Sequence, residues 1–256
     1  MRVAVRWLRA ILSAFSPMLP PDQRRRASKE LRWLADVLGP ARNLDVFRSA
    51  LLARAPARLI EPGPSKALSA AVAHQRRTAY TAAIEAIRSP RYTGMMLRLL
   101  RWFDGCGWET DQSSEDLREP ISLLAVHVLD RRLEVVRRRS EDFADQYPEQ
   151  RHRLRIALKK LRYASEALAT LYDPDKVRPF VRRLKQLQDD LGEISDVRVA
   201  HHIVAELSRG NPAVVAEAGE RLVAWHEEGL EDHEASLRQR LGDLLAMEPF
   251  WASPST

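Results

Sequence analysis

The sequence has little cysteine, little glycine and no long apolar run. Its 256 residues include one cysteine, Cys106, and ten glycines. A single cysteine excludes an intramolecular disulfide and a cysteine-based zinc site, and it suits a reducing compartment. No uninterrupted apolar stretch approaches the roughly 20 residues that a membrane-spanning helix needs. We therefore expect a cytoplasmic protein with no membrane partner.

The motifs of common enzyme classes are also missing. The sequence contains no glycine-rich phosphate loop, no nucleophile elbow and no specific Ser-His-Asp arrangement. We therefore expect no catalytic residues, no cofactor and no metal site. Several aspartates could hold Arg and Lys side chains in place or bind a divalent ion, although they follow no coordination pattern: Asp36, Asp45, Asp189, Asp190 and Asp196.

Positive charge is what the sequence has in excess. Forty-one Lys and Arg residues oppose 35 Asp and Glu residues, for a formal net charge of +6. Arg is far commoner than Lys, and its planar guanidinium can grip phosphate or carboxylate with two hydrogen bonds. The composition favours an anionic partner.

Apolar residues recur every three or four positions through most of the chain, which indicates an all-α fold. Proline and glycine clusters divide this pattern into helices. We predict helices at about 1–16, 22–38, 43–55, 66–88, 92–104, 116–141, 149–171, 175–191, 196–209 and 212–246, with a linker at about 104–115.

An internal repeat relates the two halves of the chain. Residues 1–19 align with residues 154–172 at a constant shift of 153 positions. The same shift, without a gap, places the Pro-Asp pair at 21–22 on the pair at 174–175. A register kept over so long a span indicates two copies of one helical unit.

The repeat predicts one domain, 1–256, made of two pseudo-symmetric antiparallel helical bundles. The predicted halves span about 1–104 and about 116–246, and a C-terminal tail follows at 247–256. The second copy is preceded by a predicted helix at 116–141, whereas the first begins at Met1. Either the native start lies upstream, or the first half lacks its leading helix and leaves an apolar groove.

A basic stripe runs along both copies of the repeated helix. At 100° per residue, His152, Arg155, Lys159 and Arg162 share an arc of about 80° opposite Leu154, Leu158 and Leu161. The first copy carries the matching residues Arg2, Arg6 and Arg9. Such a stripe on one helix is usually a solvated face. Two copies related by an approximate two-fold axis would instead converge on a groove and add their potentials, which suits a linear polyanion.

A second paired motif lies at 38–46 and 191–199. Its glycines, Gly39 and Gly192, are predicted to end helices in the left-handed conformation. Asn43 and Asp196 are predicted to cap the helices that follow.

Four segments carry a family resemblance: HRLRIALKKLRY at 152–163, LKQLQDDLGEISDVRVA at 184–200, LRWLADVLGPARNLDVF at 31–47 and IRSPRY at 87–92. They give the sequence a resemblance to the CHAD (conserved histidine α-helical domain) family over nearly its whole length. It implies two helical bundles around a basic central pore that binds inorganic polyphosphate, for localisation to, or organisation of, polyphosphate granules. The ligands it implies are Arg2, Arg6, Arg9, His152, Arg155, Lys159, Arg162 and Tyr163, with Arg32 and Lys185 as further candidates.

The chain departs from the family pattern in two ways. The first-half histidine has no counterpart, and the Glu-x-Glu-x-Lys strand of an accompanying triphosphatase domain is absent. A binding protein is therefore expected, with binding that strengthens when His152 is protonated. The alternatives are a nucleic-acid-binding helical protein, a polyphosphate- or triphosphate-processing enzyme, and an interaction scaffold that uses the apolar groove. The oligomeric state stays open.

Overall fold

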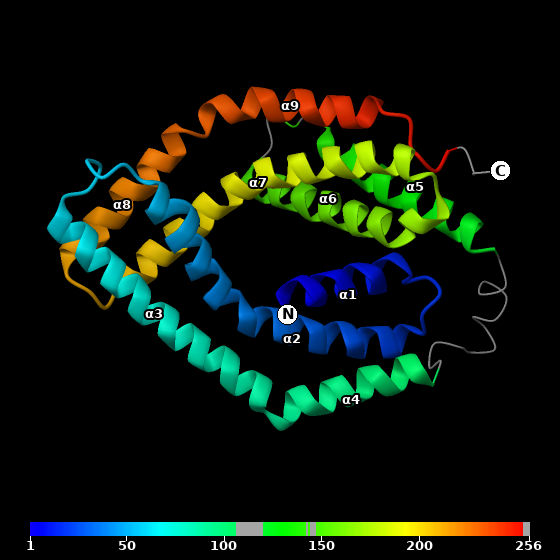
Figure 1. Ribbon diagram of the computed structural model, residues 1–256, viewed down its shortest axis with the longest axis horizontal. Coiled ribbons are helices and arrows are strands. Elements are labelled where there is room, and N and C mark those ends of the chain that lie inside the picture. Colours follow the sequence, from blue (N-terminus) through cyan, green and yellow to red (C-terminus); the bar gives the residue numbers. More distant parts are fainter. Residues whose placement is uncertain (106–119, 142, 144–146, 253–256) are drawn as a thin grey trace. The chain divides into compact units, whose positions relative to one another are not determined.

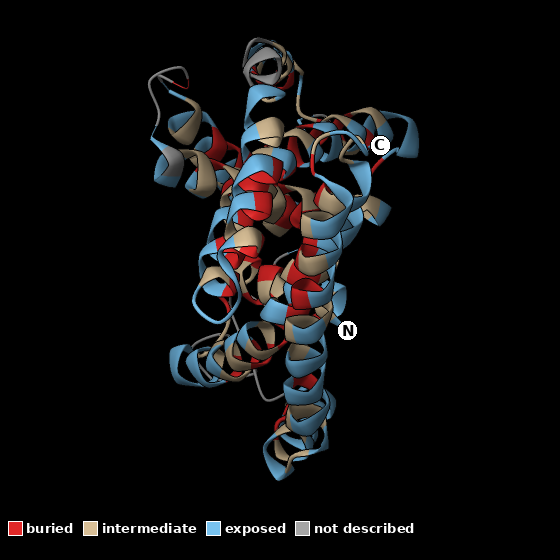
Figure 2. Ribbon diagram, turned by 90° about the vertical axis from the view of Figure 1, so that its left-hand side faces the viewer, coloured by how far each residue is buried: buried red, intermediate tan, exposed pale blue. Residues whose placement is uncertain are grey.

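The computed structural model describes residues 1–105, 120–141, 143 and 147–252. These residues form helices and no strand (Figure 1), so the predicted all-α fold is confirmed. The α-helices are α1 (Arg2–Ala14), α2 (Pro21–Val46), α3 (Pro62–Arg88), α4 (Pro90–Asp104), α5 (Ile121–Ser140), α6 (Pro148–Leu168), α7 (Pro174–Ser208), α8 (Ala213–Glu228) and α9 (Glu231–Ala246). Most of them bury one side and expose the other (Figure 2).

The chain divides into two compact units. The first comprises residues 1–33, 94–191 and 235–256, and the second comprises residues 34–93 and 192–234. Each unit therefore contains segments from both sequence halves. The N-terminal parts of α2 and α7 belong to the first unit and their C-terminal parts to the second.

The core of the first unit lies around α6, which packs against both α1 and α5. The apolar residues Leu154, Leu158 and Leu161 of α6 are completely buried. The predicted C-terminal tail also contributes to this unit. Phe250 and Trp251 are buried there, edge-to-face with Phe180.

The core of the second unit joins the C-terminal parts of α2 and α7 to α3 and α8, and α3 packs against α8. After α2 the chain forms a π-helical turn, Phe47–Leu51, and a 3₁₀ turn, Leu52–Arg54. Phe47 and Leu51 are buried in this core. The turn therefore keeps the apolar side of α2 inward after the α-helix has ended.

The repeat predicted from the sequence appears in the helix boundaries. Helices α2 and α7 begin at Pro21 and Pro174, which the 153-residue shift pairs. Proline suits this first helical position because its fixed backbone angle is helical and its missing N–H would have no partner there. All of α1 corresponds to a stretch within α6. Helices α2 and α7 therefore share both sequence register and start, whereas α6 begins before the residue that pairs with the start of α1.

The predicted helix ends at Gly39 and Gly192 are wrong. Helix α2 continues through Gly39, Pro40 and Asn43, and α7 continues through Gly192 and Asp196. The apolar period does not stop at these positions, because apolar residues continue at three- and four-residue spacing: the buried Leu34, Leu38, Ala41 and Leu44 in α2, and the buried Leu187, Leu191, Val197 and Ala200 with the partly buried Ile194 in α7. Burial of this face outweighs the local helix-ending signals.

Another boundary was also predicted wrongly. The helix expected at 212–246 is two helices, because α8 ends at Glu228 and α9 starts at Glu231. Gly229 lies at the break. Most of the predicted linker, from residue 106 on, lies outside the described residues.

Candidate functional site

The two copies of the basic helix are neighbours in the first unit. Helix α1 packs directly against α6 (Figure 1). Pro148 occupies the first turn of α6, and the Gln150 side-chain oxygen accepts a hydrogen bond of 2.7 Å from the Tyr147 backbone N–H. This cap fixes the start of α6 just before its basic residues.

The predicted ligands on α1 and α6 are mostly half-buried. Arg6 is exposed, whereas the other cationic candidates on these helices have intermediate exposure: Arg2, Arg9, His152, Arg155, Lys159 and Arg162. A simple solvated face would expose most of them. Positive charge is therefore kept close to the packed surface of α6, where the screening by water is weaker.

Arg162 is held in one orientation by three neighbours. Its Nε donates a hydrogen bond of 2.9 Å to Gln188 Oε1, and its Nη1 lies 2.5 Å from Glu166 Oε1. Gln188 is itself buried and donates to the Leu158 carbonyl at 3.0 Å. The guanidinium carbon lies 4.5 Å from the centre of the Tyr163 ring. These contacts preorganise Arg162, and Glu166 offsets part of its charge.

Tyr163 supports this arrangement from below the surface. Only 6% of the residue is exposed, and its ring lies against the Arg162 guanidinium. This cation–π contact stabilises the position of Arg162. A direct bond from the Tyr163 hydroxyl to a ligand stays a prediction.

Lys160 is a charged residue of α6 that the sequence pattern does not single out. It has intermediate exposure, and burial lowers its pKa, as do the positive charges of Arg132, Arg139 and Arg9 in that order. Arg9 belongs to the first copy of the repeat and Lys160 to the second. Charges of the two copies therefore act on each other across the α1–α6 contact.

The two α5 arginines in this cluster are held by backbone oxygens. Arg139 Nη1 donates a hydrogen bond of 2.8 Å to the Arg153 carbonyl. Arg132 Nη2 donates to the Ser13 carbonyl, and it lies 3.0 Å from Ser13 Oγ. Burial lowers the pKa of Arg132, and the neighbouring charge of Arg131 adds to this effect. In the sequence, this arginine cluster is marked only by the run Arg137–Arg139 and the pair Arg131 and Arg132. Helical periodicity alone does not show which way these side chains point.

Arg32 and Lys185 lie on helices other than α1 and α6, which carry the basic stripe. Each is exposed, Arg32 on α2 and Lys185 on α7, in the first unit. Each also belongs to an exposed row with spacing i, i+4, i+7 and i+11 that the 153-residue shift repeats. The rows are Arg25, Lys29, Arg32 and Asp36 on α2, and Arg178, Arg182, Lys185 and Asp189 on α7. Among the basic residues of these rows, the sequence predicted only Arg32 and Lys185 as ligands.

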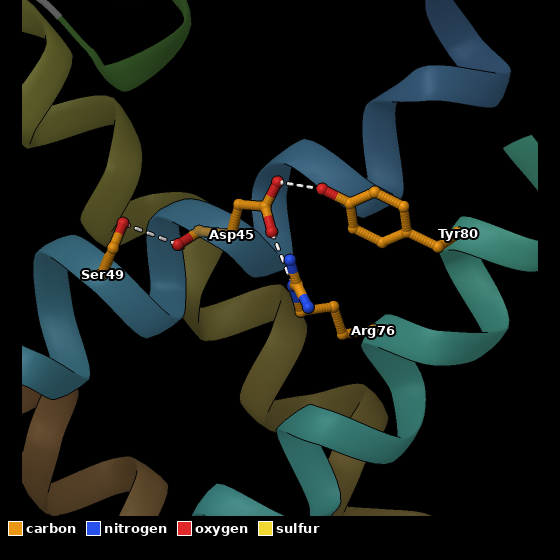
Figure 3. A network of polar contacts seen from close by, with 4 residues as sticks. All are labelled: Asp45, Ser49, Arg76 and Tyr80. Atoms are coloured by element: carbon orange, nitrogen blue, oxygen red, sulfur yellow. Dashed lines mark hydrogen bonds and ion pairs between the residues drawn. The ribbon is translucent and has the colours of Figure 1, made fainter.

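Two of the candidate aspartates hold arginines. In the second unit, Asp45 accepts hydrogen bonds from Arg76 Nε at 2.6 Å and from the Tyr80 hydroxyl at 2.8 Å (Figure 3). Burial raises the pKa of Asp45, but the Arg76 and Tyr80 bonds and the charges of Arg76 and Arg42 outweigh it and lower that pKa overall. In the first unit, Asp190 binds Arg240 Nη1 through both oxygens, at 3.0 and 2.8 Å.

The candidate aspartates do not form a metal centre in the described part of the chain, where no three His, Cys, Asp or Glu residues are grouped to hold an ion. The second unit contains a cavity of about 430 Å³, lined by Glu193, Asp196 and Glu228 as well as Arg54 and His226. Its acidic lining sets it apart from the basic helices of the first unit. The described helices also include none that is both long enough and apolar enough to cross a membrane.

Comparisons with known proteins agree with this architecture. The crystal structure of the CHAD domain from the plant Ricinus communis is similar, with a TM-score of 0.81 and 28% sequence identity, covering 97% of this chain and 81% of that one. PptA from Streptomyces chartreusis shares the fold, with a TM-score of 0.64 and 19% identity, covering 96% of this chain and 88% of that one.

A search of curated proteins found no match to the sequence. The CHAD domain family model matches residues 1–205, from the first basic helix through most of α7. This span includes both copies of the basic helix and the α5 arginines between them. The chain therefore belongs to the CHAD domain family.

Proposed function

We propose that this protein binds inorganic polyphosphate through the charged residues of α1 and α6. We call this set the α1–α6 basic surface: Arg2, Arg6, Arg9, His152, Arg155, Lys159, Lys160 and Arg162. The observation that carries the proposal is the packing of two repeat-related basic helices against each other, with Arg9 and Lys160 close enough to interact. Membership of the CHAD family supports the choice of ligand.

The charge arrangement favours a polymeric anion over a single small one. Like charges that are half-buried and close together repel each other, and the cost is greatest where water is partly excluded. An anion with regularly spaced charges offsets this repulsion along both helices. Arg and Lys would donate charge-assisted hydrogen bonds to successive phosphate oxygens, and counterions released from the polymer would add to the affinity.

A nucleic acid is the second candidate, because its backbone carries the same phosphate charge. Proteins that bind single strands usually also offer aromatic rings on which bases stack. Tyr163, the aromatic residue among the predicted ligands, is 6% exposed with its ring against Arg162, whereas Trp7 on α1 is 39% exposed and could stack on a base. The charged residues of α1 and α6 outnumber this ring, so phosphate contacts would dominate and a ligand without bases suits the surface. Competition between polyphosphate and nucleic acid at equal phosphate concentration separates the two.

The central test removes three charges from α6. The triple variant Arg155→Ala, Lys159→Ala and Arg162→Ala should lose retention on immobilised polyphosphate, with a fall in affinity of about 100-fold or more, since each charge-assisted bond contributes roughly 1.5–3 kcal/mol. Circular dichroism should show an unchanged helix content. Retention at wild-type strength would contradict the proposed site.

A matched control removes the same amount of charge from the second unit. Arg48, Arg77 and Arg209 are exposed there. Their replacement by Ala lowers the net charge equally and should cost less than about tenfold in affinity, because only long-range attraction is lost. Equal losses in the two triple variants would mean that net charge, and not this surface, holds the ligand. Phosphate release with added magnesium tests the alternative of a processing enzyme; we expect none.

A further inference from the structure

A basic pocket lies between the C-terminal end of α1 and helix α5. Its volume is about 400 Å³. Its polar lining residues are Ser13, Ser16, His127, Arg131 and Arg132, and the described residues around it include neither Asp nor Glu. The volume is within the usual range of sites for small ligands, roughly 300–1,000 Å³.

The pocket holds two guanidinium groups close together. Arg132 has intermediate exposure, and its Nη2 is fixed by the carbonyl and hydroxyl of Ser13. Burial and the nearby charge of Arg131 lower its pKa, which places these two cations within mutual electrostatic reach. Paired like charges in a partly enclosed, acid-free pocket are stabilised by an anion.

This pocket is linked to the α1–α6 basic surface by its own residues. Arg132 lines the pocket, and its charge also lowers the pKa of Lys160, which belongs to the α1–α6 basic surface. Ser13 and Ser16 lie four and seven residues after Arg9, the last basic residue of α1. Positive charge therefore continues from the helix pair into the pocket.

We propose that the pocket is a second phosphate site, which takes the terminal phosphate groups of a polyphosphate chain. The proposal rests on the proposed function and adds a preference for chain ends. A terminal phosphate has one more ionisable oxygen than an internal one, and therefore more charge and more acceptors. Two guanidinium groups, two hydroxyls and an imidazole supply matching donors, and a pocket suits a group that ends better than one that continues.

The test compares a short polymer, which is rich in ends, with a long one. His127 and Arg131 are exposed and suit substitution better than Arg132, which is bonded to Ser13. The double variant His127→Gln and Arg131→Gln should weaken tripolyphosphate binding about tenfold or more in calorimetry. Binding of a long chain, at equal phosphate concentration, should change by less than about threefold, since most of its contacts lie on α1 and α6. Arg137→Gln, at another exposed position of α5, is the control and should change neither.

The possible failures can be told apart. Unchanged tripolyphosphate affinity in the double variant, or no tripolyphosphate binding by the wild-type protein, would overturn the pocket assignment while the α6 triple variant still reports on the main site. Orthophosphate that binds as tightly as tripolyphosphate, with the same loss in the double variant, would overturn the chain-end assignment and identify the ligand as free phosphate. Long-chain retention by the α6 triple variant would instead count against the proposed function.

Discussion

At the scale of single residues, Lys160 shows what a helical wheel of one helix leaves out. Lys160 lies about 80° from His152 on the side away from the predicted stripe, so the periodicity of α6 gives it no role. The fold surrounds it with Arg9 from α1 and with Arg132 and Arg139 from α5. These neighbours are distant in sequence, and only packing brings their charges together.

Removal of this charge should separate stability from binding. Because burial and three arginines lower the pKa of Lys160, its protonated form is less favourable in the folded state than in the unfolded one. The cost is fully present below the lowered pKa and disappears as the pH rises through it toward the ordinary value of 10.5. Without ligand at neutral pH, Lys160→Met should raise Tm by about 2–4 °C, which corresponds to roughly 1 kcal/mol.

The same variant should gain less Tm than the wild-type protein when polyphosphate is added, because one favourable contact is lost. Thermal unfolding with and without polyphosphate measures both effects. Lys66→Met, at an exposed position of α3, is the control and should leave both values nearly unchanged. A lower Tm for Lys160→Met without ligand would show that the lysine stabilises the empty protein.

At the scale of helices, the proline signals for helix starts held, whereas the glycine signals for ends at 39 and 192 and the cap signals for starts at 43 and 196 did not. Proline marks the starts of α2 and α7, and the structure confirms both. The glycines at 39 and 192 predicted ends that do not exist, because the buried faces of both helices continue past them. A local signal at a helix end competes with burial along the whole face, and a sequence pattern does not weigh the two.

Pro40 makes this competition measurable. It lies inside α2 and is exposed, so it removes a backbone hydrogen bond without filling space in the core. The repeat places Glu193 at the equivalent position of α7, which is helical without a proline. Pro40→Ala should therefore stabilise the protein by about 1 kcal/mol, or ~2–4 °C in Tm.

Thermal unfolding followed by circular dichroism tests this change. The proposed polyphosphate affinity should stay the same, because Pro40 belongs to the second unit. A fall in Tm would indicate that α2 needs the bend that a proline imposes in order to bury its apolar face on both sides of position 40.

At the scale of the whole molecule, duplication is what made the fold predictable. Apolar periodicity indicated an all-α protein, the repeat indicated two related halves, and the family resemblance agreed with both. The compact units do not coincide with those sequence halves, because α2 and α7 each contribute to both units. The charges on α5 and the rows on α2 and α7 could not be assigned to a site, since their orientation depends on contacts made only in the folded chain.

The salt dependence of binding follows from the number of charges in the proposed surface. Seven of its eight residues are Lys or Arg. Neutralisation of one phosphate charge by each would give a slope of about −5 for log K against log salt concentration, with the coefficient for single strands. The α6 triple variant has three fewer of these charges, so any residual binding should show a slope smaller in size by about 2.

Replacement of Arg48, Arg77 and Arg209 should weaken binding without changing the slope, because residues that only attract the polymer from a distance release no counterions on contact. Titrations between 50 and 300 mM salt, roughly the range over which such slopes are resolved, measure all three proteins. A wild-type slope near zero would mean that phosphate charge does not drive binding, and an equal change of slope in the two triple variants would place the contacts outside α6.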